Sequence, residues 1–447
     1  MLFTKQKERK IHILFLSKPL PKLILQIISL CSISPNFPEN IYSNYMGGSM
    51  VRVIVLGLGM VGIIFSVGLE RIKKGEVKPY GVPFADVDLG IKISDLELAG
   101  AIEVDSRKVG RTVYEVAREF YRMEHVPESL KAVKVYPGLG AEFVEDLFPV
   151  QKLSHREAMD RVYETLKELK PDVILDVTTT QQGKIYKSWL EYEKDVLKGK
   201  AAPSQVYAYL ALRYADEVKP VAYVNLIPTP VANSPAIISA AEKVGAVVLG
   251  DDGATGATPF TADILEHLRE RNRRVYCIAQ FNIGGNTDFL ALLDEKRNKA
   301  KKGTKSSIVK DILGYEPPNY IRPTGYLEPL GDKKFVAMHI MYESFNGAVD
   351  EIIVNMRIND SPALAGLMVD LARLAKLALD KGIRGTVYEI NAFFTKKPAP
   401  LGSRNIARIL AYHQLLNFIE SIRAKKISVE REVVLEKPVS EEVYGAE

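Results

Sequence analysis

The chain has 447 residues, of which 47% are hydrophobic and 26% charged, so it is long enough for two or three globular domains with ample core. The formal net charge of +5 is small for this length, and basic residues are interspersed with acidic ones, which excludes an extended surface for nucleic acid. The two cysteines, Cys31 and Cys277, are too few for a disulfide framework, which predicts a cytoplasmic protein.

Residues 1–49 differ in character from everything that follows. The segment Lys5–Lys10 is basic, and Leu23–Ile33 is apolar but too short to span a bilayer. A signal peptide or membrane anchor is one interpretation of this pattern. Because a strand and helix begin directly after Met50, we predict instead a disordered or non-native N-terminal extension, and no membrane partner.

A glycine-rich turn follows the first strand. The β-branched run Val51–Val55 precedes it, and apolar residues at helical spacing follow as far as Ile72. This order is typical of a dinucleotide-binding βα unit, in which the helix N-terminus faces the pyrophosphate; a purely structural turn is the alternative. The residues expected to contact the cofactor here are Gly57, Gly59, Met60, Val61 and Gly62.

The acid that binds the adenine ribose in such folds does not stand at the usual distance. We predict that Asp105, in the strand Ala101–Asp105, takes this role after an insertion rich in Gly, Pro and Asp. Its carboxylate would accept both ribose hydroxyls and favour NAD over NADP. A solvated strand end is the alternative.

Helices and strands then alternate, as in a parallel sheet covered on both faces. The expected helices are 154–169, 203–216 and 234–244, and the expected strands are 172–177, 220–225 and 246–250. Each strand ends in a polar turn, namely Thr178-Thr179-Thr180, Asn225–Pro230 and Gly250–Gly253. Ligands bind at the carboxyl ends of such strands, so we expect the site there.

The pattern changes near Pro259. A helix over 260–271 and a strand over 275–282 lead into an antiparallel module, whose hairpin 335–344 and 349–358 turns at Asn346-Gly347. Long amphipathic helices over 364–379 and 406–422 follow. The predicted fold is a Rossmann-like doubly wound α/β domain (50–258 and 362–447) with an inserted α+β catalytic and tetramerisation domain (259–361).

Four further segments have residue types suited to binding an anion. In the loop Gly250–Pro259, small residues and hydroxyls precede a helix, so that backbone N–H groups face a phosphate. The turn Asn282–Asp288 offers amides and glycines. Lys301 and Lys305 share a face if their basic segment is helical; a solvated loop is the alternative. The last segment comprises Lys334 and the pair Lys396-Lys397, which follows Asn391–Phe394, read as a strand end; alone, each is a surface lysine.

Taken together, these motifs resemble myo-inositol-1-phosphate synthase, in the shorter archaeal form of that family. The resemblance runs from about Val51 to about Phe418. It is carried, in chain order, by the glycine fingerprint, the Gly250-Asp251-Asp252 loop ending in Gly256-Ala257-Thr258, the Asn-x-x-Gly-Asn-x-Asp turn, Lys305-Ser306-Ser307, Gly331-Asp332-Lys333-Lys334 and Asp360-Ser361.

The resemblance implies a cytoplasmic isomerase with tightly held NAD that converts D-glucose 6-phosphate to 1L-myo-inositol 1-phosphate. Hydride leaves C5 for NAD, C6 loses a proton, the resulting enolate attacks the C1 aldehyde, and the same hydride returns to C5. Each step places negative charge on oxygen, which fixed lysine cations stabilise in a closed site. A homotetramer is also implied.

The resemblance assigns roles residue by residue. The implied catalytic residues are Lys301, Lys305, Lys334, Lys396 and Asp288; Lys301 and Lys334 would face the reacting oxygens, Lys396 would transfer a proton at C5, and Asp288 would orient a lysine. Whether Lys396 or Lys397 is the active-site lysine stays open. The implied phosphate site comprises Thr255, Gly256, Ala257, Thr258, Asn286, Lys305 and Ser306. Thr179, Asp252, Asp360 and Ser361 complete the implied cofactor site.

One departure from the family concerns charge near the cofactor. Ala254 and Thr255 stand where eukaryotic members have Lys and Ser, so a divalent metal or monovalent cation is an expected substitute, with Asp252 and Asp288 as candidate ligands. Two other functions stay open. A sugar-phosphate dehydrogenase would accumulate NADH, and a non-catalytic NAD-binding module would leave glucose 6-phosphate unchanged.

Overall fold

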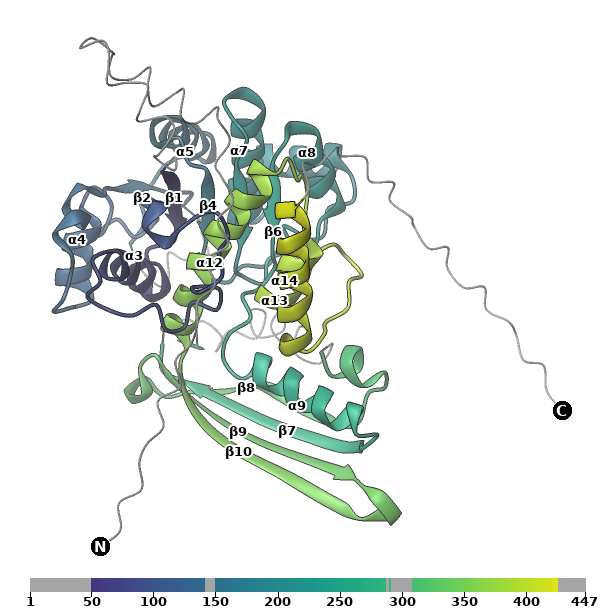
Figure 1. Ribbon diagram of the computed structural model, residues 1–447. Helices are drawn as coiled ribbons and strands as arrows, with labels where there is room; N and C mark the ends of the chain where they lie inside the picture. The colour runs from purple at the N-terminus through teal and green to yellow at the C-terminus, as the bar shows by residue number, and fades with distance from the viewer. Residues whose placement is uncertain (1–49, 141–148, 287–288, 291–307, 425–447) are drawn as a thin grey trace, which may run out of the picture. The chain divides into compact units, whose positions relative to one another are not determined.

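The computed structural model of the protein describes residues 50–140, 149–286, 289–290 and 308–424 (Figure 1). These residues contain two sheets, a six-stranded parallel sheet and a four-stranded mixed sheet. The combination of a Rossmann-like parallel sheet with a second, smaller sheet confirms the predicted fold class.

The parallel sheet has the strand order β3-β2-β1-β4-β5-β6, which is the doubly wound order of dinucleotide-binding folds. Two crossovers start from β1 and β4 in opposite directions, so the carboxyl ends of these two central strands border a crevice. The strands are β1 Val51–Leu56, β2 Leu96–Glu103, β3 Val135–Pro137, β4 Val173–Asp176, β5 Ala222–Asn225 and β6 Val247–Leu249.

Helices cover both faces of this sheet because alternate residues of each strand point to opposite sides. In β1, Val53 and Val55 belong to the core beneath α3 and α12, whereas Ile54 and Leu56 belong to the core beneath α5, α7 and α8. The helices of the first layer are α3 Met60–Lys73, α12 Asp360–Asp380, α13 Tyr388–Phe394 and α14 Arg408–Ala424; those of the second are α5 His155–Leu169, α6 Trp189–Leu197, α7 Pro203–Glu217 and α8 Pro235–Val244.

Local sequence explains where several of these helices begin. Ser154 accepts a hydrogen bond from the Glu157 N–H while the Glu157 side chain accepts one from the Ser154 N–H, a capping box that starts α5. Pro203 and Pro235 lie in the first turns of α7 and α8, where no backbone N–H is needed. None of the helices in the described ranges combines the length and apolar character needed to cross a bilayer.

The second sheet has the order β10-β9-β7-β8 and packs one face on α9 Thr258–Glu270 and on residues 308–313. Its strands are β7 Arg274–Gly284, β8 Asn319–Tyr326, β9 Lys333–Glu343 and β10 Val349–Asn359. The predicted hairpin is confirmed, with Asn346 and Gly347 at positive φ between β9 and β10. The expected antiparallel pairing holds for β7, β9 and β10, but the sheet also contains β8, which was not predicted and pairs parallel with β7.

The strand end expected at Asn391–Phe394 is also wrong, because these residues form the C-terminal half of α13. Ile390, Ala392 and Phe394 are buried there, so the apolar content that resembles a strand serves a short helix packed against α14. The chain passes without a loop from β10 into α12. The domain limits at 258/259 and 361/362 stay a prediction.

Gly366 allows α12 to approach the segment between α3 and β2. A Cβ added at Gly366 would lie 2.2 Å from the Gly81 carbonyl oxygen, a backbone atom that cannot move aside easily. The same segment is held by Arg373, which donates to the carbonyls of Phe84, Val87 and Ile91. Contact of α12 with this segment therefore requires glycine.

We predict that Gly366→Ala lowers the free energy of unfolding by about 1–3 kcal/mol, because the added methyl group overpacks this contact. Gly68→Ala is the matched control, since Gly68 is also helical and nothing lies within 4 Å of its added Cβ. That control should be neutral or stabilising by up to about 1 kcal/mol. Urea unfolding of both variants checks this, and equal stabilities would contradict the assigned contact.

Candidate active site

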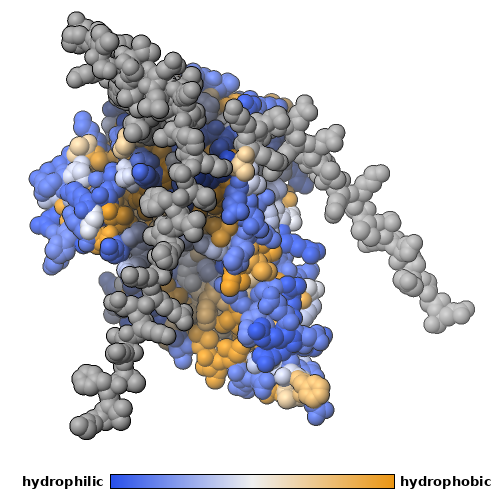
Figure 2. All heavy atoms as spheres, viewed as in Figure 1, coloured by the Kyte–Doolittle hydropathy of each residue, from blue (hydrophilic) through white to orange (hydrophobic). Residues whose placement is uncertain are grey.

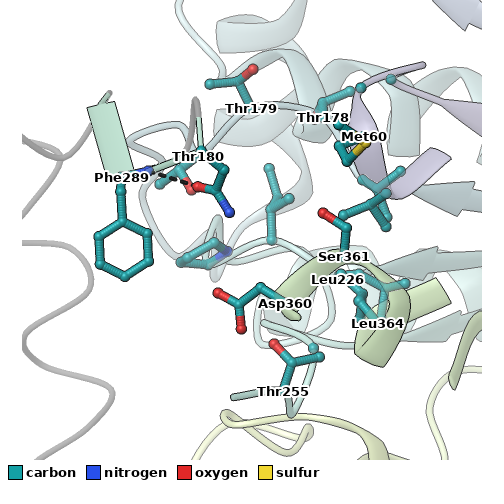
Figure 3. Close-up of a pocket in the computed structure, with 18 of the residues that line it drawn as sticks. Met60, Thr178, Thr179, Thr180, Leu226, Thr255, Phe289, Asp360, Ser361 and Leu364 are labelled. Carbon is teal, nitrogen blue, oxygen red and sulfur yellow. Dashed lines mark hydrogen bonds between the residues drawn. The ribbon is translucent and has the colours of Figure 1, made fainter. Parts of the chain in front are cut away.

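One cavity of about 440 Å³ lies at the carboxyl ends of the central strands, within the range typical of small-molecule sites. It runs from the glycine turn after β1 to the first residues of α9 and α12. Figure 3 shows Thr178, Thr179 and Thr180 on one side of it and Asp360 and Thr255 on another. The predicted site residues that line it are Gly57, Gly59, Met60, Val61, Asp105, Thr179, Asp252, Thr255, Ala257, Thr258, Asn286, Lys334, Asp360, Ser361 and Lys396.

The glycine turn has the geometry that a pyrophosphate needs. Gly57 has φ +89°, a conformation that favours glycine, and an added Cβ there would lie 2.9 Å from Thr178 Cα. Gly62 does not line the cavity but packs beneath it, where a Cβ would lie 2.4 Å from the Gly57 carbonyl oxygen. Helix α3 begins at Met60, so its N-terminal N–H groups face the cavity.

The end of β2 holds a carboxylate that sequence reasoning missed. Glu103 is the last residue of β2. Its carboxylate accepts a hydrogen bond from the Leu58 N–H at 3.1 Å and forms an ion pair with Lys108 at 3.2 Å. The predicted residue, Asp105, lies two residues beyond the strand and is paired with Arg107. Burial opposes its ionisation, but the hydrogen bonds from Arg107 hold the pKa of Asp105 below its usual range.

The threonine turn is anchored by a buried aspartate. Asp176, the last residue of β4, accepts hydrogen bonds from the Thr178 N–H and hydroxyl and from the Tyr223 hydroxyl at 2.6 Å. Burial raises the pKa of Asp176 against these hydrogen bonds. The network holds Thr178, Thr179 and Thr180 at the cavity wall.

Asp251 organises the loop after β6. Its carboxylate is fully buried and accepts hydrogen bonds from the Asn225 amide and from the backbone N–H groups of Val231, Ala232 and Asn233, and also from the Asn233 amide. Burial raises the pKa of Asp251 to about 6, although these donors favour the carboxylate. The loop is thereby fixed with the next residue, Asp252, at φ +64° and facing the cavity.

Lys396 is brought to the cavity by an ion pair with Asp252, with 2.9 Å between Nζ and Oδ1. Both side chains are largely buried, at 14% and 7% exposure. The backbone N–H of Lys396 also donates to the Asp252 carbonyl. Of the two candidate lysines, Lys396 lines the cavity, whereas Lys397 forms backbone hydrogen bonds with Asp251.

Lys334 forms the second ion pair of the cavity. Its ammonium group lies 3.0 and 3.1 Å from the two carboxylate oxygens of Asp360 and 5.5 Å from the centre of the Phe289 ring. Gly256 lies against this lysine, since an added Cβ would be 2.5 Å from Nζ. A strand residue of the second sheet and the first residue of α12 thus meet at the cavity.

The start of α12 is tied to the Asn286 turn through Asp332. One Asp332 oxygen accepts from the Ser361 hydroxyl at 2.6 Å and the other from the Ser361 N–H at 3.0 Å. The Asn286 amide donates to the same carboxylate at 3.3 Å. These contacts place Asn286 and Ser361 side by side at the cavity wall.

Several predicted residues lie outside the described part of the chain. These are Lys301, Lys305, Ser306 and Asp288. The predicted roles of these residues stay predictions. Within the described residues, no group of three or more His, Cys, Asp or Glu side chains is placed to hold a metal, and Asp252 is already paired with Lys396. Asp288, the other candidate ligand, lies outside the described residues, so the expected cation stays a prediction.

Comparisons with known proteins relate this chain to one enzyme family. A family model described as myo-inositol-1-phosphate synthase matches residues 256–361. The inositol-3-phosphate synthase of Mycolicibacterium smegmatis is 26% identical over 390 residues, which cover 83% of this chain and 98% of that protein. A solved structure of a myo-inositol-1-phosphate synthase-related protein from Thermotoga maritima is 47% identical, with a TM-score of 0.76, covering 83% of this chain and 98% of that one.

A more distant structure shares the fold. The inositol-3-phosphate synthase of Caenorhabditis elegans superposes with a TM-score of 0.71 at 17% identity and covers 89% of this chain and 90% of its own.

We predict that Asp251→Asn lowers the free energy of unfolding by about 2 kcal/mol or more, because hydrogen bonds to a buried charged group contribute about 1.5–3 kcal/mol each. The new amide group would also face the donors of Asn233. Asp88→Asn is the control: the Asp88 side chain is 75% exposed and paired with Arg423, and solvent-exposed ion pairs of this kind contribute little to stability. Urea unfolding that ranks the two variants equally would refute the role of Asp251.

Proposed function

This chain belongs to the myo-inositol-1-phosphate synthase family, a family of isomerases, and on that basis we propose that it converts D-glucose 6-phosphate to 1L-myo-inositol 1-phosphate without net redox change. The observation that carries the proposal is the continuity of one cavity from the glycine turn to Lys334 and Lys396. A dinucleotide bound at the turn would thus have two lysines near its reactive end.

The described residues fit NAD. Gly57 and Gly62 keep the turn tight, because a Cβ at either position would meet backbone atoms at 2.9 Å or less. A Cβ at Gly59 would meet nothing within 4 Å, so the backbone there is open to a pyrophosphate, whose negative charge the N-terminus of α3 favours. Bound NAD would accept hydride from C5 of the opened sugar and later return it. We assign the pyridine end of the site to Thr179, Asp252, Asp360 and Ser361, which line the cavity beyond the turn.

The two lysines would stabilise negative charge on the reacting oxygens. In the proposed reaction, oxidation at C5, enolisation at C6 and attack on C1 each pass through an oxygen anion, and oriented ammonium groups in a water-poor cavity stabilise such charge. We assign Lys334 to the oxygens of the carbon chain and Lys396 to proton transfer at C5. Asp360 and Asp252 hold these ammonium groups in place at 3.0 and 2.9 Å.

The substrate phosphate would bind at the start of α9. Thr255, Ala257 and Thr258 line the cavity at this helix N-terminus, and Asn286 lies on the wall as well. Unpaired N–H groups and the helix dipole favour a phosphate at such a position. Lys305 and Ser306 would complete this site, and Lys301 and Asp288 would lie beside the reacting carbons; all four are outside the described residues.

We also propose a homotetramer that uses the open face of the second sheet. Ile353 on β10 is 69% exposed and Phe281 on β7 is 44% exposed. The centroids of the Phe281 and Tyr320 rings are 5.5 Å apart. Figure 2 shows apolar side chains gathered over this sheet in the lower part of the view. Exposed apolar side chains gathered on one face are typical of subunit contacts.

Purified protein given glucose 6-phosphate and a catalytic amount of NAD should form inositol phosphate with no lasting absorbance of NADH. The reason is that hydride removed at C5 returns to the same carbon in each turnover. Phosphate NMR of the product and absorbance at the NADH band check this together. Stoichiometric NADH would identify a sugar-phosphate dehydrogenase, and unchanged glucose 6-phosphate would identify a non-catalytic module.

Lys396→Met should lower kcat by about 100-fold or more, because it removes a general acid–base group. The adjacent Lys397→Met is the matched control and should keep kcat close to the wild-type value, since Lys397 does not line the cavity. Bound NAD, measured after release by heat, should be unchanged in both. Equal rates in the two variants would show that the active-site lysine has been misassigned.

Ile353→Asp should dissociate the tetramer, because it places a charge in the apolar contact. Leu190→Asp is the control, since Leu190 is 75% exposed on α6, a helix that packs on the parallel sheet and not on the second sheet. Light scattering coupled to gel filtration measures the mass of each variant. Loss of the tetramer in the Leu190 variant alone, or in neither, would contradict the assigned surface.

A further inference from the structure

The end of β2 carries two carboxylates and two cations, and their pairing distinguishes the two acids. Glu103 pairs with Lys108, and Asp105 pairs with Arg107. All four residues line the cavity on the side of the glycine turn. In a Rossmann fold, this is the place where a carboxylate binds the adenine ribose hydroxyls, or a cation binds the 2′-phosphate of NADP.

Glu103 is the acid joined to the glycine turn. Its Oε2 accepts from the Leu58 N–H at 3.1 Å, and its Oε1 accepts from the backbone N–H groups of Val104 and Asp105. The contacts of Oε2 lie at the long end of the hydrogen-bond range, so this oxygen can accept a further short bond from a ribose hydroxyl. Asp105, in contrast, already accepts two hydrogen bonds from the Arg107 side chain at 2.7 and 2.9 Å.

Lys108 is the counter-ion of Glu103. Its ammonium group donates to Glu103 at 3.2 Å, to the Leu58 carbonyl at 3.1 Å and to the Tyr121 hydroxyl at 3.3 Å. The side chains of Lys108 and Glu103 are only 10% and 6% exposed. Burial opposes the charge of Lys108, but Glu103 and Tyr121 raise its pKa, so it stays an ammonium at neutral pH. Arg107 differs in that its side chain is 53% exposed.

These contacts have a consequence for dinucleotide choice. A 2′-phosphate beside the ribose would meet the Glu103 carboxylate, and the only nearby buried cation among the described residues would already be neutralised by it. Without the Glu103 carboxylate, the Lys108 ammonium would keep its hydrogen bonds to Leu58 and Tyr121 but lose its counter-ion, and a 2′-phosphate could take the place of that carboxylate. The cavity therefore contains a cation suited to the 2′-phosphate of NADP, namely Lys108, but Glu103 neutralises its charge.

We propose that Glu103, rather than Asp105, sets the preference of this protein for NAD over NADP, and that Lys108 is a concealed 2′-phosphate-binding cation exposed when Glu103 is neutralised. The proposal rests on the proposed function, in that the cavity is taken to hold a dinucleotide. It adds two specificity-determining residues that the glycine fingerprint does not reveal.

The test is a competition titration in which NAD or NADP displaces bound NADH, and NADH fluorescence reports the displacement. It gives the dissociation constants of NAD and NADP for the wild type and for variants at both positions. Glu103→Gln keeps the size of the side chain and should lower the ratio of the NADP to the NAD dissociation constant by about ten-fold or more. Lys108→Met should raise that ratio, because Glu103 then has no counter-ion. The double variant should return within about three-fold of the wild-type ratio, since neither charge remains.

Two further variants serve as controls. Glu97→Gln removes a carboxylate from the same strand, where it pairs with Arg52 at the opposite end, and should leave the ratio unchanged. Asp105→Asn should also leave it unchanged. A shift caused by Asp105→Asn, or a Glu103→Gln shift that Lys108→Met does not reverse, would overturn the proposal.

Failure of the broader function gives a different result. Wild-type protein that binds no NADH would overturn the proposed function and this inference with it. Wild-type binding with a ratio that Glu103→Gln leaves unchanged would overturn the inference alone. If Glu103→Gln does not fold, as judged by thermal unfolding, the Lys108→Met variant decides, and an unchanged ratio there is also contradictory.

Discussion

Charge pairing inside one cavity is the constraint on which the rest of this structure depends. Three lysines, Lys108, Lys334 and Lys396, are largely buried there, and each forms an ion pair with one carboxylate. An unpaired buried charge costs several kcal/mol, so each pair also requires its two chain segments to stay together. The Lys396–Asp252 pair joins residues 144 positions apart, and Lys334–Asp360 joins the second sheet to α12. The ion pairs that hold these ammonium groups in the cavity therefore also hold distant chain segments together.

This arrangement explains why the site lies where the two sheets meet. Strand β10 continues directly into α12, and α12 packs on the parallel sheet (Figure 1). The first residues of α12 line the cavity together with Val177 and Leu226, which directly follow β4 and β5. Asp360 and Ser361 are those first residues. The parallel sheet supplies the turn suited to a dinucleotide, and the second sheet supplies Lys334. Neither sheet alone would assemble the cavity.

The sequence predicted those features that depend on local chemistry. The glycine turn, the Asn346-Gly347 hairpin and the helices with clear caps follow from residues a few positions apart. Features that depend on distant partners were not predictable. The short, mostly apolar segment Asn391–Phe394 is compatible with a strand or a helix, and its packing against α14 selects the helix. Likewise, the register of β2 with β1 pairs Ile102 with Leu56, and the Gly57 N–H donates to the Ile102 carbonyl. This pairing puts Glu103, and not Asp105, beside the glycine turn, and the sequence alone does not give the register.

The most direct test of the central claim is a crystal structure of the protein with NAD and a non-reacting glucitol 6-phosphate. We expect the pyrophosphate at the N-terminus of α3 and the ammonium groups of Lys334 and Lys396 within about 3 Å of the sugar oxygens, the distance of a charge-assisted hydrogen bond. The account would be contradicted by a dinucleotide bound elsewhere, or by a pyridine ring whose neighbouring sugar is contacted by neither lysine.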